Sequence, residues 1–280
     1  MKKLSLLALT LCLPALAQDG FRVGVELGSM KTTTDGAYYL NTQTSPFPNY
    51  AYTYIGYAQP TQKPLSLDLA WINGDDEYSL TYMSTSKSAT QTFTDYSNYN
   101  YLIQQSFKAS IVDLTWTHAF AKWEKGSLAF SGGLRSISGS DELSQTTTNS
   151  GYYYYYTQKT SGSGIGLTAG LHGRMNFNDR FWLTTGFTTA MINDKMSVDR
   201  NYYNYNLTQT GTYSYPGVQH KSILQTAAYL RLNMQIVGGL KGYLGYDVRN
   251  YGSEAFGNFY NFGTQGFGLA GTTLGVSYTF

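Results

Sequence analysis

The chain offers few side chains that could act as nucleophiles or metal ligands. Its three histidines, His118, His172 and His220, stand far apart, with no H-x-x-H or C-x-x-C spacing around them. A zinc site needs clustered ligands, so we expect no metal and no cofactor. The single cysteine, Cys12, lies in an N-terminal segment that we expect to be removed, which leaves no thiol for chemistry.

Charged residues are more informative, because many of them alternate with aliphatic residues. Alternation places them on one face of extended strands, where they would share an enclosed space. This set comprises Glu26, Asp68, Glu77, Asp113, Arg135, His172, Arg174, Arg231, Asp247 and Arg249. Separate acidic and basic arcs would orient polar solutes in a pore, whereas paired charges would fill a narrow lumen. We favour the paired network, with His172 as a hydrogen-bond partner, because breaking a buried ion pair costs roughly 3–5 kcal/mol.

Tyrosine is the most over-used residue type, with 27 copies, and most of them fall between the alternating segments. Their neighbours are Asn, Thr, Ser, Gln and Gly. Flat amphipathic rings give contact area at low entropic cost and can lie against sugars. We therefore predict contact residues at Tyr52, Tyr54, Tyr99, Tyr101, Tyr153, Tyr154, Tyr155, Tyr203 and Tyr205. The alternative is a low-complexity cover that stacks on itself and on lipopolysaccharide, without a specific ligand.

Period-two alternation predicts ten strands with one aliphatic face each. They are Phe21–Lys31, Pro64–Asn73, Asp76–Ser86, Lys108–Phe120, Gly126–Ser138, Gly164–Phe177, Phe181–Ile192, Ser222–Ile236, Leu240–Asn250 and Gly268–Phe280. Short turns and long connections alternate between them, as in outer-membrane barrels. The fold predicted is all-β: a transmembrane up-and-down antiparallel β-barrel of about ten strands.

Alternation alone does not say which face is inside, because a soluble lipocalin-like barrel would also alternate. Three features favour aliphatic side chains facing lipid. The polar face is rich in Gly, Ser and Thr, and several segments reach the ~9–11 residues that a tilted membrane strand needs. Aromatic residues also gather near the short turns, as an interfacial girdle would; they are Trp71, Phe120, Trp123, Phe177, Phe181, Trp182, Tyr278 and Phe280.

The N-terminus has the pattern of a bacterial signal peptide. Lys2 and Lys3 precede an apolar run, and Ala15-Leu16-Ala17 fits a cleavage site, so we expect a cut after Ala17. The expected organisation is a signal peptide at 1–17 and an outer-membrane barrel with five long extracellular loops at 18–280. Without the two lysines the charge balances, since 17 basic residues face 17 acidic ones. This balance does not favour nucleic acid as a partner.

The final strand, Leu274 to Phe280, resembles the terminal strand of bacterial outer-membrane proteins, in which a last Phe follows alternating apolar residues. The resemblance implies recognition by the barrel-assembly machinery, and we assign Tyr78, Tyr278 and Phe280 to this assembly signal. It also implies outer-membrane lipid and lipopolysaccharide as surroundings.

We expect a surface scaffold whose tyrosine-rich loops contact glycans, matrix or cells. The alternative is a narrow channel for small polar solutes. Omptin surface proteases also have ten strands, but they use an Asp/His pair near the outer rim. Here Val218 and Gln219 precede His220, where a nearby acid would be needed, so we do not expect an enzyme.

Overall fold

The structure is a computed structural model that describes residues 20–32, 37–42, 51–56, 62–94, 99–206, 210–214, 217–250 and 268–280. These residues form thirteen strands. Their bounds are β1 Phe21–Thr32, β2 Ala37–Thr42, β3 Ala51–Gly56, β4 Leu65–Asn73, β5 Asp76–Thr94, β6 Asn100–Trp123, β7 Gly126–Asn149, β8 Tyr152–Asn176, β9 Phe181–Asn206, β10 Thr210–Ser214, β11 Gly217–Val237, β12 Leu240–Asn250 and β13 Gly268–Thr279. The expected signal peptide lies outside the described residues.

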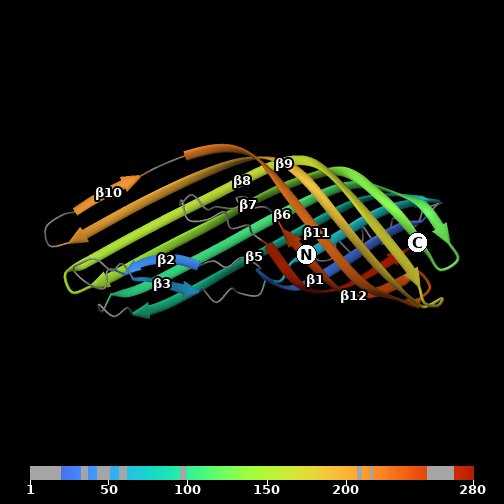
Figure 1. Ribbon diagram of the computed structural model, residues 1–280, viewed down its shortest axis with the longest axis horizontal. Helices are drawn as coiled ribbons and strands as arrows, with labels where there is room; N and C mark the ends of the chain where they lie inside the picture. Colours follow the sequence, from blue (N-terminus) through green and yellow to red (C-terminus); the bar gives the residue numbers. More distant parts are fainter. Residues whose placement is uncertain are drawn as a thin grey trace, which may run out of the picture.

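Ten of these strands close into an antiparallel barrel in which each strand pairs with its neighbours in chain order (Figure 1). The order is β1, β4, β5, β6, β7, β8, β9, β11, β12 and β13, and β13 pairs with β1 to complete the ring. The predicted fold class is therefore confirmed, and each of the ten predicted segments falls on one barrel strand. In the part of the chain that the structure describes, no helix is long and apolar enough to cross a membrane.

The aliphatic faces point outward, as predicted. Leu167 is 71% exposed, and Ile165 and Leu171 on the same strand are nearly as open, whereas the neighbouring Thr168 is buried. This polarity is the reverse of a water-soluble barrel, in which the aliphatic side chains would fill the interior. Ten strands that expose rows of Leu, Val and Ile along their whole circumference are matched to a lipid surrounding.

An aromatic belt follows the short-turn end. Trp71 stacks on Tyr78 with ring centroids 5.4 Å apart, and Trp116 meets the edge of Phe130 at 5.1 Å. The prediction for Trp182 was wrong, because this side chain is 7% exposed and faces the lumen. Trp182 has the same alternation as the inward-facing polar residues of β9. Its position next to a turn led us to assign it to the aromatic belt instead.

Three of the five expected long loops are largely strand, which corrects the predicted organisation. The strands β5 to β9 continue well past the predicted ends, and β7 joins β8 through a turn at Ser150 and Gly151, where φ is +81° at the glycine. Figure 1 shows these strands extending together to one end of the molecule, with β10 beside β9. Thr and Tyr favour extended backbone, but these stretches lack the aliphatic alternation on which the strand prediction depended. The first expected loop contains the β2–β3 hairpin, and the fifth, at 251–267, lies outside the described residues.

Closure generates the first prediction. A barrel whose first and last strands are hydrogen-bonded has no free edge from which to unravel. We expect the refolded protein to migrate faster on a mildly denaturing gel when it is not boiled than when it is boiled. Identical mobility of the two samples, under conditions where circular dichroism still reports β structure, would contradict a closed barrel.

Candidate functional site

The lumen contains a four-residue charge cluster that joins the first strand to two of the last ones. Arg231 Nη2 lies 2.8 Å from Glu26 Oε2 and 3.1 Å from Asp247 Oδ2. Arg249 Nη2 contacts the same two acids, at 3.3 and 2.8 Å. Both carboxylates are buried, and the Tyr243 hydroxyl also donates to Glu26. Each acid therefore has two cationic partners, which is how a buried charge is kept at low cost.

Two further ion pairs line the same space. Arg22 reaches Asp68 at 2.9 Å and both carboxylate oxygens of Glu77, at 2.8 and 2.9 Å. Arg135 makes a two-pronged contact with Asp113, at 2.7 and 2.8 Å. Arg22 was not among the predicted site residues, although it precedes Glu26 by four positions and so shares its face. Its position on the same face as Glu26 was the signal that would have placed it among the lumen residues.

His172 and Arg174 occupy the polar face of β8. His172 Nε2 is 2.8 Å from the Ser131 hydroxyl and its Nδ1 is 3.0 Å from the Tyr229 hydroxyl. The guanidinium of Arg174 lies over the Trp182 ring, 4.7 Å from its centroid. All ten predicted lumen residues thus face the same interior, and they line a cavity of about 520 Å³.

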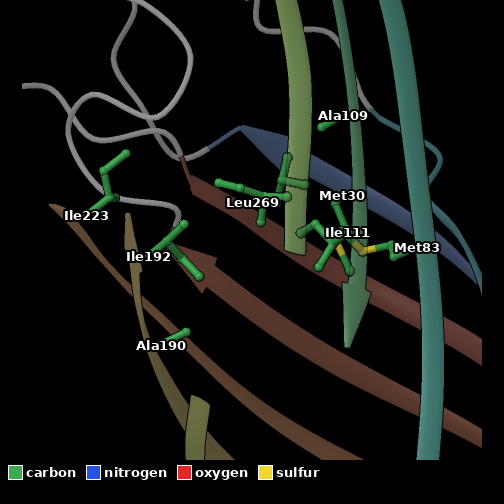
Figure 2. Packing of buried hydrophobic residues seen from close by; sticks show 9 residues of the cluster. Met30, Met83, Ala109, Ile111, Ala190, Ile192, Ile223 and Leu269 are labelled. Carbon is green, nitrogen blue, oxygen red and sulfur yellow. The ribbon is translucent and has the colours of Figure 1, made fainter. Parts of the chain in front are cut away.

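An apolar ring lines the lumen on the long-strand side of the charges, and the buried polar side chains of Gln62 and Thr85 lie beside it. We use this name for Met30, Met83, Ala109, Ile111, Ile137, Ala190, Ile192, Ile223 and Leu269, all buried at 6% exposure or less. They come from β1, β5, β6, β7, β9, β11 and β13, and Figure 2 shows side chains from these strands projecting into one interior region. Each occupies an inward-facing position of its own strand, beyond the charged residues and toward the long-strand end. All seven strands thus carry a Met, Ile or Leu where the inner face would otherwise be polar.

The sequence analysis did not predict the ring, because each strand contributes only one or two of its members. Met30 is in phase with Glu26, Ile137 with Arg135, and Ile192 with the polar residues of β9. A single aliphatic residue on a polar face carries no weight within one strand. Aliphatic residues at the same level on the polar faces of many strands do indicate an apolar layer. That level can be recognised only when the register between the strands is known.

The predicted tyrosine contacts separate into two faces. Tyr153 and Tyr155 are each 38% exposed on the outer face, and the rings of Tyr153 and Tyr203 meet at 6.0 Å. Tyr101 is only 8% exposed, so the structure contradicts its assignment as a contact residue. Tyr101 has the inward parity of Ile111 on the same strand.

The remaining tyrosines of the predicted set are placed as follows. Tyr99 meets the edge of Tyr152 at 5.5 Å, and Tyr154 takes the inward parity of Tyr156. Tyr52 and Tyr54 lie on β3, and Tyr205 pairs in register with Tyr153. In the assembly signal, Tyr278 contacts Phe280 at 4.8 Å, but Tyr78 lies on β5 and belongs to the aromatic belt.

His220 and the acid nearest to it in the sheet lie on opposite faces. His220 pairs in register with Lys195 and is exposed, whereas the preceding residue of β9, Asp194, is buried inside the barrel. A catalytic Asp/His pair needs the two side chains within hydrogen-bond reach of each other or of one water. The other rim residues that the structure describes do not bring a carboxylate to His220.

Solved structures with this architecture are outer-membrane proteins. The outer membrane protease OmpT from Escherichia coli superposes with a TM-score of 0.52 at 14% identity, covering 94% of this chain and 97% of that one. The yersiniabactin receptor FyuA of Yersinia pestis gives 0.44 at 14% identity, over 94% of this chain and 43% of that one. The attachment protein Ail of Yersinia pestis gives 0.26 at 12% identity, over 94% and 99%. No protein family profile and no curated protein sequence matches the chain. The first likeness shows the fold alone.

The charge network leads to a stability prediction. Replacing Arg135 by Ala leaves Asp113 enclosed without its cation, and we expect the free energy of unfolding from lipid vesicles to fall by about 3 kcal/mol. The matched control is Lys122→Ala, because Lys122 pairs with Asp75 on the exposed turn. There we expect a loss below about 1 kcal/mol. Equal losses in the two variants, measured by denaturant titration with tryptophan fluorescence, would contradict a structural role for the network.

Proposed function

We propose that the protein is a surface scaffold of the bacterial outer membrane, closed to solutes, which holds tyrosine-rich strands outside the membrane for contact with glycans, matrix or other cells. The observation that carries this proposal is the apolar ring. The side chains of this ring have no polar group to replace the hydration of a passing solute, and the adjacent polar pair, Thr85 and Gln62, is hydrogen-bonded to itself. Hydrophobic constrictions of this kind block conduction by excluding water.

The extended strands support the contact role. We name the extended sheet as residues 86–94, 100–108, 138–149, 152–163 and 193–206, from β5 to β9. Registered pairs place Thr92, Leu102, Thr146, Tyr155 and Tyr203 in one row across its outer face. Strands lie about 4.8 Å apart, so hydroxyls and rings recur at a fixed spacing. Sugars offer hydroxyls and apolar faces at similar spacings, which suits an ordered surface better than a mobile loop.

The surroundings follow from where the outer face changes character. Aliphatic residues give way to serine at one level of four adjacent strands, because Ser84, Ser110, Ser138 and Ser163 form a registered row. We assign this level to the boundary between lipid chains and lipopolysaccharide sugars. We also assign Tyr278 and Phe280 of the terminal strand to recognition by the barrel-assembly machinery. The proposal includes no catalytic role.

A narrow channel remains the second candidate, and the cavity favours it. The space of about 520 Å³ beneath the ring is lined by charges of both signs and is large enough for a small polar solute. We expect passage to require the ring to move, because buried side chains from seven strands gather on that side of the cavity.

Conductance separates the two candidates. We expect the purified protein to show no discrete openings in a planar bilayer. Replacing Ile111, Ile192 and Ile223 together by Ser should wet the ring and produce steps of measurable conductance. The control replaces the lipid-facing Val112, Leu224 and Met191 by Ala, which leaves the lumen intact. Regular openings of the unaltered protein would favour the channel instead.

Adhesion tests the contact role. Substituting Tyr153, Tyr155 and Tyr203 by Ser removes two exposed rings and the half-buried ring that contacts Tyr153, and we expect the strand pairing to be kept. We expect binding of expressing cells to immobilised polysaccharide or matrix to fall at least tenfold. The control variant changes Thr90, Thr92 and Thr94 to Ser, on the same face and at the same height. Undiminished binding by the tyrosine variant, or equal losses in both, would contradict the proposed contact surface.

A further inference from the structure

The cavity is lined by more basic than acidic side chains. Six basic and five acidic side chains line it, which leaves one net positive charge when His172 is neutral. Each of the five acids lies within 4 Å of at least one arginine. The arginines that make these contacts are Arg22, Arg135, Arg231 and Arg249. The two other bases, Arg174 and Lys241, have no carboxylate within that distance among the residues that the structure describes.

The Arg174 guanidinium is held in a fixed orientation. Its Nε donates to Asn176 Oδ1 at 2.8 Å, and its plane lies over the ring of Trp182. Trp182 is itself buried, and its carbonyl accepts a hydrogen bond from the Asn233 amide. These contacts engage one edge and one face of the guanidinium. The two terminal nitrogens form the fork that binds a carboxylate in two parallel hydrogen bonds.

Lys241 comes to the same place from another strand. The one hydrogen bond that the structure describes for its ammonium group is a long one, 3.5 Å to the Thr279 hydroxyl. The register that links Trp182 to Asn233, and Asn233 to Tyr243, brings β8, β9, β11 and β12 together around this part of the lumen. Lys241 and Arg174 line the same cavity of about 520 Å³. Glu77 lines this cavity too, but Arg22 holds its carboxylate at both oxygens.

Both cations stand at the short-turn mouth of the lumen. Lys241 follows the turn at Gly238 and Gly239, and Arg174 lies just before the turn that leads into β9. Arg174 is exposed and Lys241 is half-buried. The apolar ring, which we propose excludes solutes, lies on the opposite side, so a small solute would enter the cavity from the short-turn side. In the proposed orientation that side is the periplasm.

We propose that Arg174 and Lys241 form a binding site for a small organic carboxylate in the vestibule below the apolar ring. One monovalent carboxylate would neutralise the net charge of the cavity. The Arg174 fork supplies a bidentate contact, Lys241 adds a point charge, and the cavity volume lies in the range of small-molecule sites. The site requires neither conduction through the ring nor adhesion by the extended sheet.

The test uses the refolded full-length mature protein in detergent micelles. The indole N–H of Trp182, identified by its loss in Trp182→Phe, serves as the reporter in nuclear magnetic resonance titrations. The probes are acetate, benzoate and inorganic phosphate at constant ionic strength. We expect a saturable shift with acetate and benzoate, and at least tenfold weaker binding in Arg174→Ala and in Lys241→Ala. Arg174→Lys should bind with intermediate strength, because it keeps the charge and loses the fork. Lys122→Ala removes a cation outside the cavity and should leave binding unchanged.

Several results would overturn the site. Carboxylates that produce no saturable shift, or equal affinities in the unaltered protein and both alanine variants, would exclude it. Tighter binding of phosphate than of either carboxylate would refute the ligand class. If Arg174→Ala does not give the heat-resistant gel mobility of a folded barrel, Lys241→Ala and Arg174→Lys decide the outcome alone.

Discussion

The structure depends on the pairing of its last strand with its first. In hydrocarbon, an unpaired backbone amide or carbonyl costs several kcal/mol, so a membrane sheet must have no open edge. Eleven registered pairs between β1 and β13, from Arg22 with Thr279 to Thr32 with Leu269, satisfy both edges at once. The rest of the structure depends on this closure of the barrel, because closure creates an interior and places every second side chain of each strand inside it.

The interior then has to be filled, and two kinds of chemistry divide it. Near the short turns, arginines and acids pair across strands that are distant in sequence, as Glu26 does with Arg231 and Arg249. Further along, the same inward positions carry Met, Ile and Leu. The charges fix the relative positions of strands around the barrel, while the apolar ring excludes water. A lumen of this kind is suited to holding the strands rigidly, so that β5 to β9 can extend beyond the membrane as one sheet.

Sequence reasoning predicted the barrel because lipid exposure and a polar interior impose an unambiguous period of two. It placed the lumen charges for the same reason. It stopped short at the outer ends of the strands, where Thr90, Tyr155 and Asn201 alternate with other polar residues and no aliphatic rhythm remains. It also missed the apolar ring, since the ring is defined by register between strands. Such features depend on pairing across the sheet, and composition within one segment does not encode it.

The direction in which β8 presents its aliphatic residues tests the account most directly. Cys12 is the only cysteine of the chain and belongs to the expected signal peptide, so single cysteines can be placed at 164–171 in the mature protein and spin-labelled. In lipid vesicles we predict that labels at 165, 167, 169 and 171 are accessible to oxygen, which dissolves in lipid, and that those at 166, 168 and 170 are not. Oxygen accessibility without this period of two, or shielding of the odd positions in a protein that stays dissolved without detergent, would contradict a barrel with lipid outside and charges within.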